Sequence, residues 1–123
     1  MSAFALAADV TAPSFERPVD LVHLARQTLG DRALEREVLS LFKVQTKVII
    51  AQLHEIGDEK MRYDLAHTLK GSARAVGAWK VAEAAEACER ASADKAAQWQ
   101  EALADLAGRI ETALAAIEDF IRN

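Results

Sequence analysis

The sequence predicts an all-α protein, an antiparallel four-helix bundle with a short additional helix at its N-terminal end. The chain of 123 residues contains two prolines and five glycines, and residues with high helix propensity are abundant along it. Apolar residues recur at steps of three and four, which is the period of an amphipathic helix. The connections between the predicted helices are short, so consecutive long helices are expected to pack antiparallel.

Glycine and aspartate separate the first predicted helices, since a glycine commonly ends a helix and an aspartate caps the start of one. Asp20 is predicted to cap a short helix that ends at Gly30. Asp31 then caps a second helix over about residues 31–56. The apolar residues of this second helix recur at three- and four-residue steps: Leu34, Val38, Leu41, Phe42, Val48, Ile49, Leu53 and Ile56.

The pair Gly57–Asp58 repeats the same stop and start, and a third helix is predicted over about residues 58–76 with Gly77 as its left-handed terminator. The fourth helix, "AWKVAEAAEACERAS", is rich in alanine and has a narrow apolar stripe. Asp94 is predicted to cap the last helix, which runs to about residue 121. The apolar residues are Val81, Ala84 or Ala85, Cys88 and Ala91 in the fourth helix, and Trp99, Leu103, Leu106, Ile110, Leu114, Ile117 and Ile121 in the last.

Length and charge restrict the class of protein. A chain of 123 residues is long enough for one domain. We expect the bundle to span residues 19–123 and residues 1–18 to form a flexible tail. The net charge of -4 and the pI of about 5.4 argue against binding of nucleic acid, which requires a surplus of lysine and arginine.

The cellular location is predicted from the lack of a membrane span and of a secretory signal in the sequence. No apolar run approaches the roughly 18 residues that a membrane span requires. The apolar N-terminal stretch has no lysine or arginine before it, which makes it a poor secretory signal. Cys88 is the one cysteine, so an internal disulfide and a cysteine-based zinc cluster are excluded. We therefore expect a cytoplasmic protein that does not bind membranes and has Cys88 in its core.

The stretch "AHTLKGSARAVGA" (residues 66–78) places a histidine and a glycine inside the third predicted helix. Successive residues of a helix turn by about 100°, so the side opposite His67 carries the apolar residues Met61, Leu65, Leu69 and Val76. Within about 60° of the histidine lie Lys60, Tyr63, Asp64, Lys70, Gly71 and Arg74. His67 is therefore predicted to point to solvent rather than into the core.

Gly71 distinguishes this histidine from an ordinary exposed side chain. Glycine costs roughly 1 kcal/mol relative to alanine inside a helix, and its missing side chain would leave an open approach to His67. Lys70 and Arg74 place two cations on the same side, where they could hold a phosphoryl group. The alternative is a solvated histidine among solvated charges, but the combination with Gly71 favours a site for an anion.

The predicted chemistry is that of a phosphoryl acceptor. At neutral pH most of an exposed imidazole is unprotonated, so one ring nitrogen has a free lone pair that can attack phosphorus without a general base. Asp64, one turn before His67, could accept a hydrogen bond from the other nitrogen and orient the ring. Alternatively, Asp64 is a surface carboxylate that pairs with Lys60 or is merely solvated.

These residues resemble the signature of histidine phosphotransfer (HPt) domains, whose pattern is His-x-Leu-Lys-Gly-Ser followed by a Gly-Ala pair. Here the core runs from His67 to Ser72, and the later pair is Gly77–Ala78. The segment "GDRALEREVLSLF" is similar to the helix that precedes the site in that family, and "GDEKMRYDLAHTLKG" is similar to the entry into the phosphorylated helix. The resemblance covers about residues 19–121.

In that family the histidine takes a phosphoryl group from a receiver-domain aspartate and passes it to another. The resemblance implies this role for His67, a place beside the phosphoryl group for Lys70, and room for the receiver at Gly71. It implies a monomeric protein of bacterial two-component signalling, with response-regulator receivers and a sensor hybrid kinase as partners. It also implies no cofactor or metal on this chain, since Mg²⁺ belongs to the receiver. The sequence has no glycine-rich ATP loop, so no kinase activity of its own is expected.

Two related classes fit less well, and one hypothesis of another kind remains. The dimerisation helices of sensor kinases follow their histidine with an acidic residue and soon a proline, whereas Thr68 follows here and no proline comes after Pro18. The phosphotransfer segment of chemotaxis kinases is similar, but it is joined to further domains, which are not expected here. The second hypothesis is a helical-bundle adaptor that only binds a receiver or another signalling protein and is not phosphorylated.

Docking is expected to bury the exposed side of the third helix and the adjoining second helix. Candidates for orientation of the ring or for the rim of that face are Lys60, Tyr63, Asp64, Lys43, Gln45 and Lys47. His23 and His54 lie on other predicted helices and make no metal-ligand spacing with His67. Trp79 and Trp99 are expected in the core or an interface, because no basic field surrounds them.

Overall fold

The computed structural model describes residues 14–93 and 97–123, and this part of the chain contains five α-helices. Their bounds are Leu21–Gln27 for α2, Arg32–Glu55 for α3, Glu59–Val76 for α4, Trp79–Ala91 for α5 and Ala97–Arg122 for α6. No strand occurs in these residues, so the predicted all-α class is confirmed. Among these helices, none combines the length and the apolar character needed to cross a membrane.

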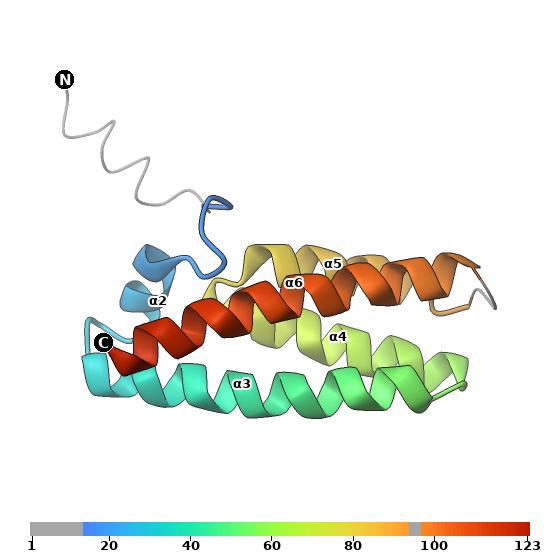
Figure 1. The fold of residues 1–123 in the computed structure, drawn as a ribbon, viewed down its shortest axis with the longest axis horizontal. Helices are drawn as coiled ribbons and strands as arrows, with labels where there is room; N and C mark the ends of the chain where they lie inside the picture. Colours follow the sequence, from blue (N-terminus) through green and yellow to red (C-terminus); the bar gives the residue numbers. More distant parts are fainter. Residues whose placement is uncertain (1–13, 94–96) are drawn as a thin grey trace, which may run out of the picture.

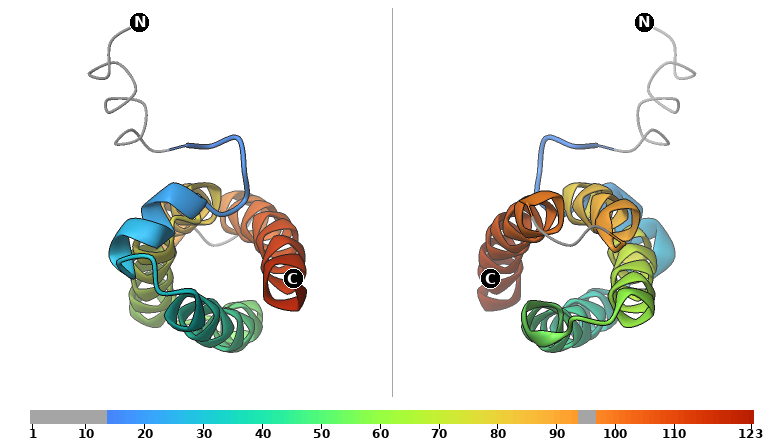
Figure 2. Two further views of the ribbon diagram at one scale, coloured as in Figure 1. Left: turned by 90° about the vertical axis from the view of Figure 1, so that its left-hand side faces the viewer. Right: turned by 90° about the vertical axis from the view of Figure 1, so that its right-hand side faces the viewer.

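The four long helices form an antiparallel bundle (Figure 1). Viewed along the bundle axis, α3, α4, α5 and α6 follow one another around a ring, and α3 and α6 are neighbours that close it (Figure 2). The short α2 lies outside this ring, where α4 ends and α5 begins. The predicted additional helix and the predicted bundle are therefore both present, and α4 lies between α3 and α5.

Most ends of the helices follow the predicted signals, but α2 ends at Gln27 and not at Gly30. The side chains of Asp20, Asp31 and Asp58 each accept a hydrogen bond from a backbone amide in the first turn of α2, α3 and α4. Gly77 ends α4 in the left-handed conformation with a φ of 82°. A Cβ at Gly77 would lie 3.0 Å from the Cβ of Asp20, so the close approach of α2 also requires glycine. The predicted cap Asp94 lies outside the described residues.

Asp20 also fastens the N-terminal segment to the bundle. Its Oδ2 accepts hydrogen bonds from the indole Nε1 of Trp79 at 2.9 Å and from the backbone amide of Ser14 at 3.0 Å. Burial raises the pKa of this carboxyl, but the hydrogen bonds outweigh burial and hold the pKa below its usual value. The predicted flexible tail is therefore attached from Ser14 onward, and residues 1–13 lie outside the described part of the chain.

The core takes one apolar face from each long helix. Leu39 and Leu53 of α3, Leu69 of α4 and Trp99 of α6 are almost completely buried. Cys88 of α5 is also buried, as predicted, and burial raises the pKa of its thiol to about 12. A thiol with that pKa stays protonated at neutral pH, so Cys88 is a small apolar core residue and not a nucleophile.

The outward face of α3 departs from the predicted pattern. The apolar spacing assigns Leu34, Leu41 and Val48 to the buried face of this helix, but all three are exposed in the structure, together with Val44. Residues seven apart share a helix face, so these side chains form a second apolar stripe on the outward side of α3, well apart from the buried one. Steps of three and four fit both stripes, and the spacing alone does not tell which of them faces the core.

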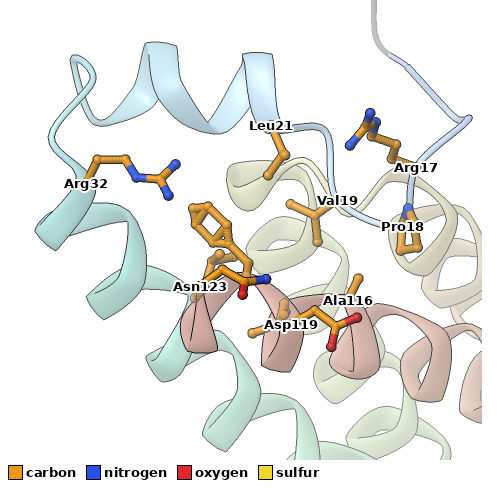
Figure 3. A pocket seen from close by; sticks show the side chains of 11 residues that line it. Arg17, Pro18, Val19, Leu21, Arg32, Ala116, Asp119 and Asn123 are labelled. Carbon is orange, nitrogen blue, oxygen red and sulfur yellow. The ribbon is translucent and has the colours of Figure 1, made fainter.

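An apolar pocket lies at the end of the bundle that holds α2 and the C-terminus (Figure 3). Its volume is about 390 Å³, and its lining includes the apolar side chains of Val19, Leu39 and Ile117 and the charged side chains of Arg17 and Arg32. None of the residues that line it belongs to α4 or α5. The pocket is therefore separate from the face of α4 that carries the predicted site.

Candidate functional site

His67 lies near the middle of α4 and points away from the core. Its side chain is 61% exposed, as its position in the helix predicts. The buried residues of α4 are Ala66, Leu69, Ala73 and Val76. Their mean direction lies about 140° from that of His67 around the helix, and not directly opposite it. The imidazole therefore leans toward α5.

Two alanines explain why the buried face of α4 is displaced toward α5. Ala66 and Ala73 are fully buried, and they lie on the side of α4 that faces α5, the helix with which α4 makes its most extensive contact. Small side chains allow two helices to approach closely. Met61, which the sequence assigns to the apolar stripe, is exposed, because it lies on the far edge of the displaced face.

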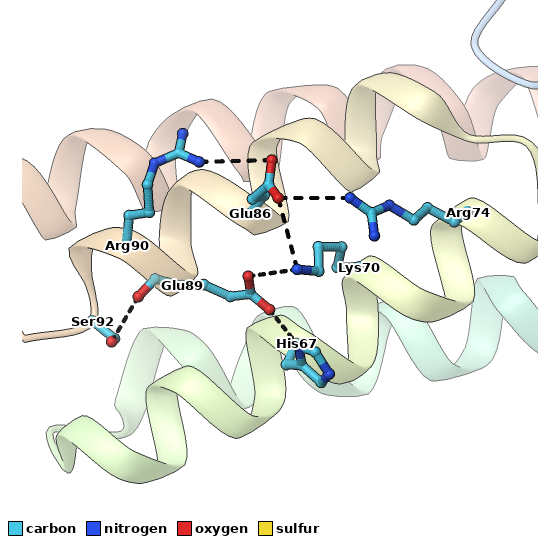
Figure 4. Close-up of polar contacts among 7 residues, drawn as sticks. All are labelled: His67, Lys70, Arg74, Glu86, Glu89, Arg90 and Ser92. Carbon is cyan, nitrogen blue, oxygen red and sulfur yellow. Dashed lines mark hydrogen bonds and ion pairs between the residues drawn. The ribbon is translucent and has the colours of Figure 1, made fainter. Parts of the chain in front are cut away.

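Glu89 of α5 holds the imidazole on the side that faces the bundle (Figure 4). Its Oε2 lies 2.6 Å from Nδ1 of His67, and its side chain is 7% exposed. An ionised carboxylate only accepts hydrogen bonds, so Nδ1 carries the proton and donates it. In the neutral ring Nε2 then holds the lone pair, and Figure 4 shows this nitrogen directed away from Glu89.

The same carboxylate binds Lys70. Its Oε1 accepts a hydrogen bond from Nζ of Lys70 at 2.7 Å, and the lysine side chain is 13% exposed. Burial raises the pKa of Glu89, but the hydrogen bonds from Lys70 and His67 outweigh burial and hold the pKa below its usual value. Glu89 is therefore ionised at neutral pH, as the assignment of the proton to Nδ1 requires.

Glu86, one turn before Glu89 on α5, faces three cations (Figure 4). Its Oε2 lies 3.8 Å from Nζ of Lys70 and 3.6 Å from the guanidinium of Arg74, and its Oε1 lies 3.6 Å from the guanidinium of Arg90. These distances are those of ion pairs and are too long for hydrogen bonds. The predicted cations Lys70 and Arg74 thus share the side of His67, and both pair with acids of α5.

Two other residues of α4 adjoin His67. The ring of Tyr63 lies parallel to the imidazole, with 5.9 Å between the ring centroids and 9° between the ring planes. One turn after His67, a Cβ built on Gly71 would meet nothing within 4 Å. Packing inside the protein therefore does not require a glycine at this position, and its role in keeping the approach open stays a prediction.

Asp64 does not orient the imidazole. Its Oδ2 accepts a hydrogen bond from Nζ of Lys60 at 2.7 Å, and both side chains are exposed. Around α4, Asp64 lies about 60° from His67 on the side away from α5, whereas the ring leans the other way. Asp64 is therefore a surface carboxylate that pairs with Lys60, the alternative given above. Glu89 makes the contact with the imidazole that the sequence assigns to Asp64.

The three candidates for the rim on α3 lie on different sides of that helix. Lys43 forms an ion pair with Glu118 of α6, and the charge of Lys47 also acts on Glu118. Both lysines therefore lie toward α6. Gln45 is exposed and lies about 160° around the helix from Lys43, toward α4. Of these three, the structure brings only Gln45 to the side of His67.

The exposed apolar stripe of α3 lies at the height of His67. The two helices are antiparallel and are joined at residues 56–58, so Val48 lies level with His67 and Val44 lies level with Gly71. We call the outward side of these two helices the α3–α4 face, and its exposed apolar side chains are Leu41, Val44, Val48 and Met61.

The motif that identifies His67 does not identify Glu86 or Glu89, because both come from another helix. One signal for Glu89 does exist in the sequence. It lies four residues after Ala85 and next to Cys88, on the apolar stripe of α5. A charged residue on such a stripe is rarely buried unless it has a charged partner, and Lys70 and His67 are the partners.

The remaining histidines and tryptophans have structural or surface positions. His23 packs edge to face against Trp79 with 4.8 Å between the ring centroids, and His54 is exposed in the last turn of α3. Trp99 is buried beneath the guanidinium of Arg62. In the part of the chain that the structure describes, no three His, Cys, Asp or Glu side chains gather to hold a metal ion.

Comparisons with known proteins yielded one match. A scan against protein-family models matches residues 37–120, more than half of the chain, to the model described as Hpt domain. The matched segment includes His67 and Lys70 of α4 and Glu86 and Glu89 of α5. A search of curated proteins and a search of solved structures returned no match.

Proposed function

We propose that this chain, which belongs to the Hpt domain family, carries a phosphoryl group on Nε2 of His67 and passes it between receiver domains. Hpt domains are the histidine phosphotransfer modules of phosphorelays and act with receiver domains and kinases. One observation carries the proposal for this residue and this atom. The hydrogen bond between Nδ1 and the buried Glu89 leaves an exposed Nε2 with its lone pair available.

The transfer needs no general base on this chain. The lone pair of Nε2 attacks the phosphorus of an aspartyl phosphate on the receiver, the N–P bond forms as the O–P bond breaks, and the aspartate leaves as a carboxylate with the bonding electrons. No proton has to leave, so the phosphorylated ring keeps the proton on Nδ1 and carries a positive charge. The carboxylate of Glu89 faces that charge across 2.6 Å and stabilises it. Transfer to a second receiver is the reverse of this step.

Two cations of α4 are placed to bind the phosphoryl oxygens. Lys70 and Arg74 follow His67 by one and two turns and lie within about 60° of it around α4. Ammonium and guanidinium groups both bind phosphoryl oxygens through charge-assisted hydrogen bonds. The Mg²⁺ ion that the reaction requires is expected in the receiver, and no cofactor is expected on this chain.

The receiver is proposed to dock on the α3–α4 face. That face carries four exposed apolar side chains as well as the exposed imidazole, and exposed apolar area supplies the affinity of a contact between proteins. The open space over Gly71 gives the receiver aspartate access to Nε2. We expect the chain to act as a cytoplasmic monomer between the receiver of a sensor hybrid kinase and that of a response regulator.

The test is transfer of labelled phosphate to the purified chain from a phosphorylated receiver domain that also labels a known phosphotransfer protein. Label on the chain should be lost in acid and kept in base, as a phosphorus–nitrogen bond requires. His67→Gln should take up no label, whereas His54→Gln, which removes another exposed histidine, should be labelled like the wild type.

Two results would refute the proposal. One is equal labelling of His67→Gln and the wild type. The other is a wild-type chain that takes up no label while the known phosphotransfer protein is labelled in the same assay. If the chain binds the receiver without being labelled, it is an adaptor and not a phosphocarrier.

A further inference from the structure

Glu86 pairs with the cations that the phosphoryl group requires. In the unphosphorylated protein its Oε2 lies 3.8 Å from Nζ of Lys70 and 3.6 Å from the guanidinium of Arg74 (Figure 4). Its other oxygen faces Arg90 at 3.6 Å. Both phosphate-binding candidates on α4 are thus already partly neutralised by a carboxylate before any phosphoryl group arrives.

A phosphoryl group on Nε2 would compete with Glu86 for these cations. It carries nearly two negative charges and three acceptor oxygens, so it is a stronger partner than one carboxylate. Of Glu86 and Glu89, the two acids of α5 that face these cations, Glu89 is hydrogen-bonded to the ring at 2.6 Å and to Lys70 at 2.7 Å. Glu86 holds its partners only across 3.6 to 3.8 Å. The phosphoryl group is therefore expected to displace Glu86, and not Glu89, from the cations.

We propose that Glu86 sets the balance of the transfer reaction by competing with the phosphoryl group for Lys70 and Arg74. This inference rests on the proposed function of His67. Glu86 touches none of the reacting atoms and acts as a positioning residue through the two cations. Its charge stabilises the free form of His67, in which the cations are paired, and repels the phosphorylated form. Both effects favour the phosphorylated receiver over the phosphorylated chain and thus favour onward transfer.

The size of the effect follows from the charges at the site. Three cations face two carboxylates there, and Glu86→Gln leaves one carboxylate while keeping the size of the side chain. Removal of one negative charge near the phosphoryl group, screened as at a protein surface, changes an equilibrium constant by about threefold to tenfold. The shift should be toward the phosphorylated chain.

The experiment measures an equilibrium and not a rate. A labelled receiver domain is mixed with an equal amount of wild-type chain, Glu86→Gln or the control Glu111→Gln, which removes the same charge from the exposed surface of α6. The distribution of label between the two proteins is followed until it is constant. The same equilibrium is also approached from the other side, starting with labelled chain and unlabelled receiver. A change that only weakens docking alters the forward and reverse rates equally and leaves this distribution unchanged.

Glu86→Gln should raise the equilibrium constant for phosphorylation of the chain by about threefold to tenfold at low ionic strength, and the gain should shrink as salt screens the charges. Glu111→Gln should match the wild type. Arg74→Gln should shift the balance the other way, because the phosphoryl group loses a cation. A labelled wild type with an unchanged distribution for Glu86→Gln, or an equal shift for Glu111→Gln, overturns this inference and leaves the proposed function standing. A wild type that takes up no label overturns both.

Discussion

The contact between Glu89 and His67 is best tested by Glu89→Gln, which keeps the size of the side chain and removes its charge. In the wild type, Oε2 accepts from Nδ1 of His67 and Oε1 accepts from Nζ of Lys70. An amide has one acceptor oxygen and one NH₂ group, so only one of these two hydrogen bonds can survive. The NH₂ group must then face the other donor inside a buried contact.

The expected loss in transfer rate follows from the charge on the ring in the transition state. A hydrogen bond to a charged group contributes about 1.5 to 3 kcal/mol. The imidazole is 61% exposed, so water screens part of the interaction, and the lower end of that range, about 1.5 kcal/mol, applies. This free energy corresponds to transfer that is about tenfold slower. Single-turnover labelling of the chain by a phosphorylated receiver measures it.

The same variant tests the direction of the pKa shift at Glu89. Burial raises the pKa of this carboxyl, but the hydrogen bonds from Lys70 and His67 outweigh burial, so the pKa is lowered in the folded protein. A lowered pKa means that ionised Glu89 stabilises the fold above about pH 4.3, the pKa of glutamate in an unfolded chain, and that this contribution is lost as the pH falls through the folded value. The difference in free energy of unfolding between wild type and Glu89→Gln, from urea denaturation, should therefore be constant near neutral pH and shrink below about pH 4.3.

Glu111→Gln serves again as the control of equal charge, and it should change neither the rate of transfer nor the pH dependence of unfolding. A folded Glu89→Gln that is labelled as fast as the wild type would refute the role of Glu89 in stabilising the charged ring. A difference in unfolding free energy that grows as the pH falls below about 4.3 would refute the reasoning on its pKa.

Three further predictions concern the backbone and the fold. Gly71→Leu should slow labelling of the chain and should raise the free energy of unfolding by up to about 1 kcal/mol, the helix cost of glycine. Gly108→Leu is the control, because a Cβ at this second helical position also meets nothing within 4 Å. It should raise the free energy of unfolding by the same amount and leave labelling unchanged. Leu29→Asn should raise the free energy of unfolding by about 0.5–1 kcal/mol. Leu29 has a φ of 54° and is 94% exposed, so the substitution relieves backbone strain and loses no buried apolar area. A lower free energy of unfolding in urea denaturation would contradict this. Asp20→Ala should lower the free energy of unfolding by about 2–3 kcal/mol, since three hydrogen bonds are lost, whereas Asp31→Ala, which loses one cap, should cost about 1 kcal/mol.

The fold could be predicted because each signal acts within a few residues of the chain. Asp31 and Asp58 cap the helices that follow them through amides in the first turn, and Gly77 ends α4 through its own φ. None of these interactions depends on which other helix lies nearby. Because the connections are short, consecutive helices must be neighbours, and this largely determines the order of the helices around the bundle.

The side of each helix that faces a given neighbour is a property of the whole bundle and could not be predicted in the same way. On α3, the stripes that contain Leu39 and Leu41 have the same spacing, and only the positions of α4 and α6 decide which stripe is buried. Lys43 and Lys47 are directed toward α6 for the same reason. The motif fixes the direction of His67 relative to its own helix but not its position relative to α5, so it leads to Asp64 on the same helix instead of Glu89.

The exposure of His67 and the burial of Glu89 have one cause. If the buried face of α4 were centred directly opposite the histidine, the imidazole would point straight into solvent, with neither neighbouring helix nearer than the other. Ala66 and Ala73 shift that face by about 40° toward α5, so Nδ1 meets a carboxylate that is 7% exposed while Nε2 stays in solvent. A hydrogen bond is electrostatically stronger where water is excluded, so the negative charge lies where it acts most strongly on the ring. The two alanines thus let a single imidazole be both accessible at one nitrogen and electrostatically supported at the other.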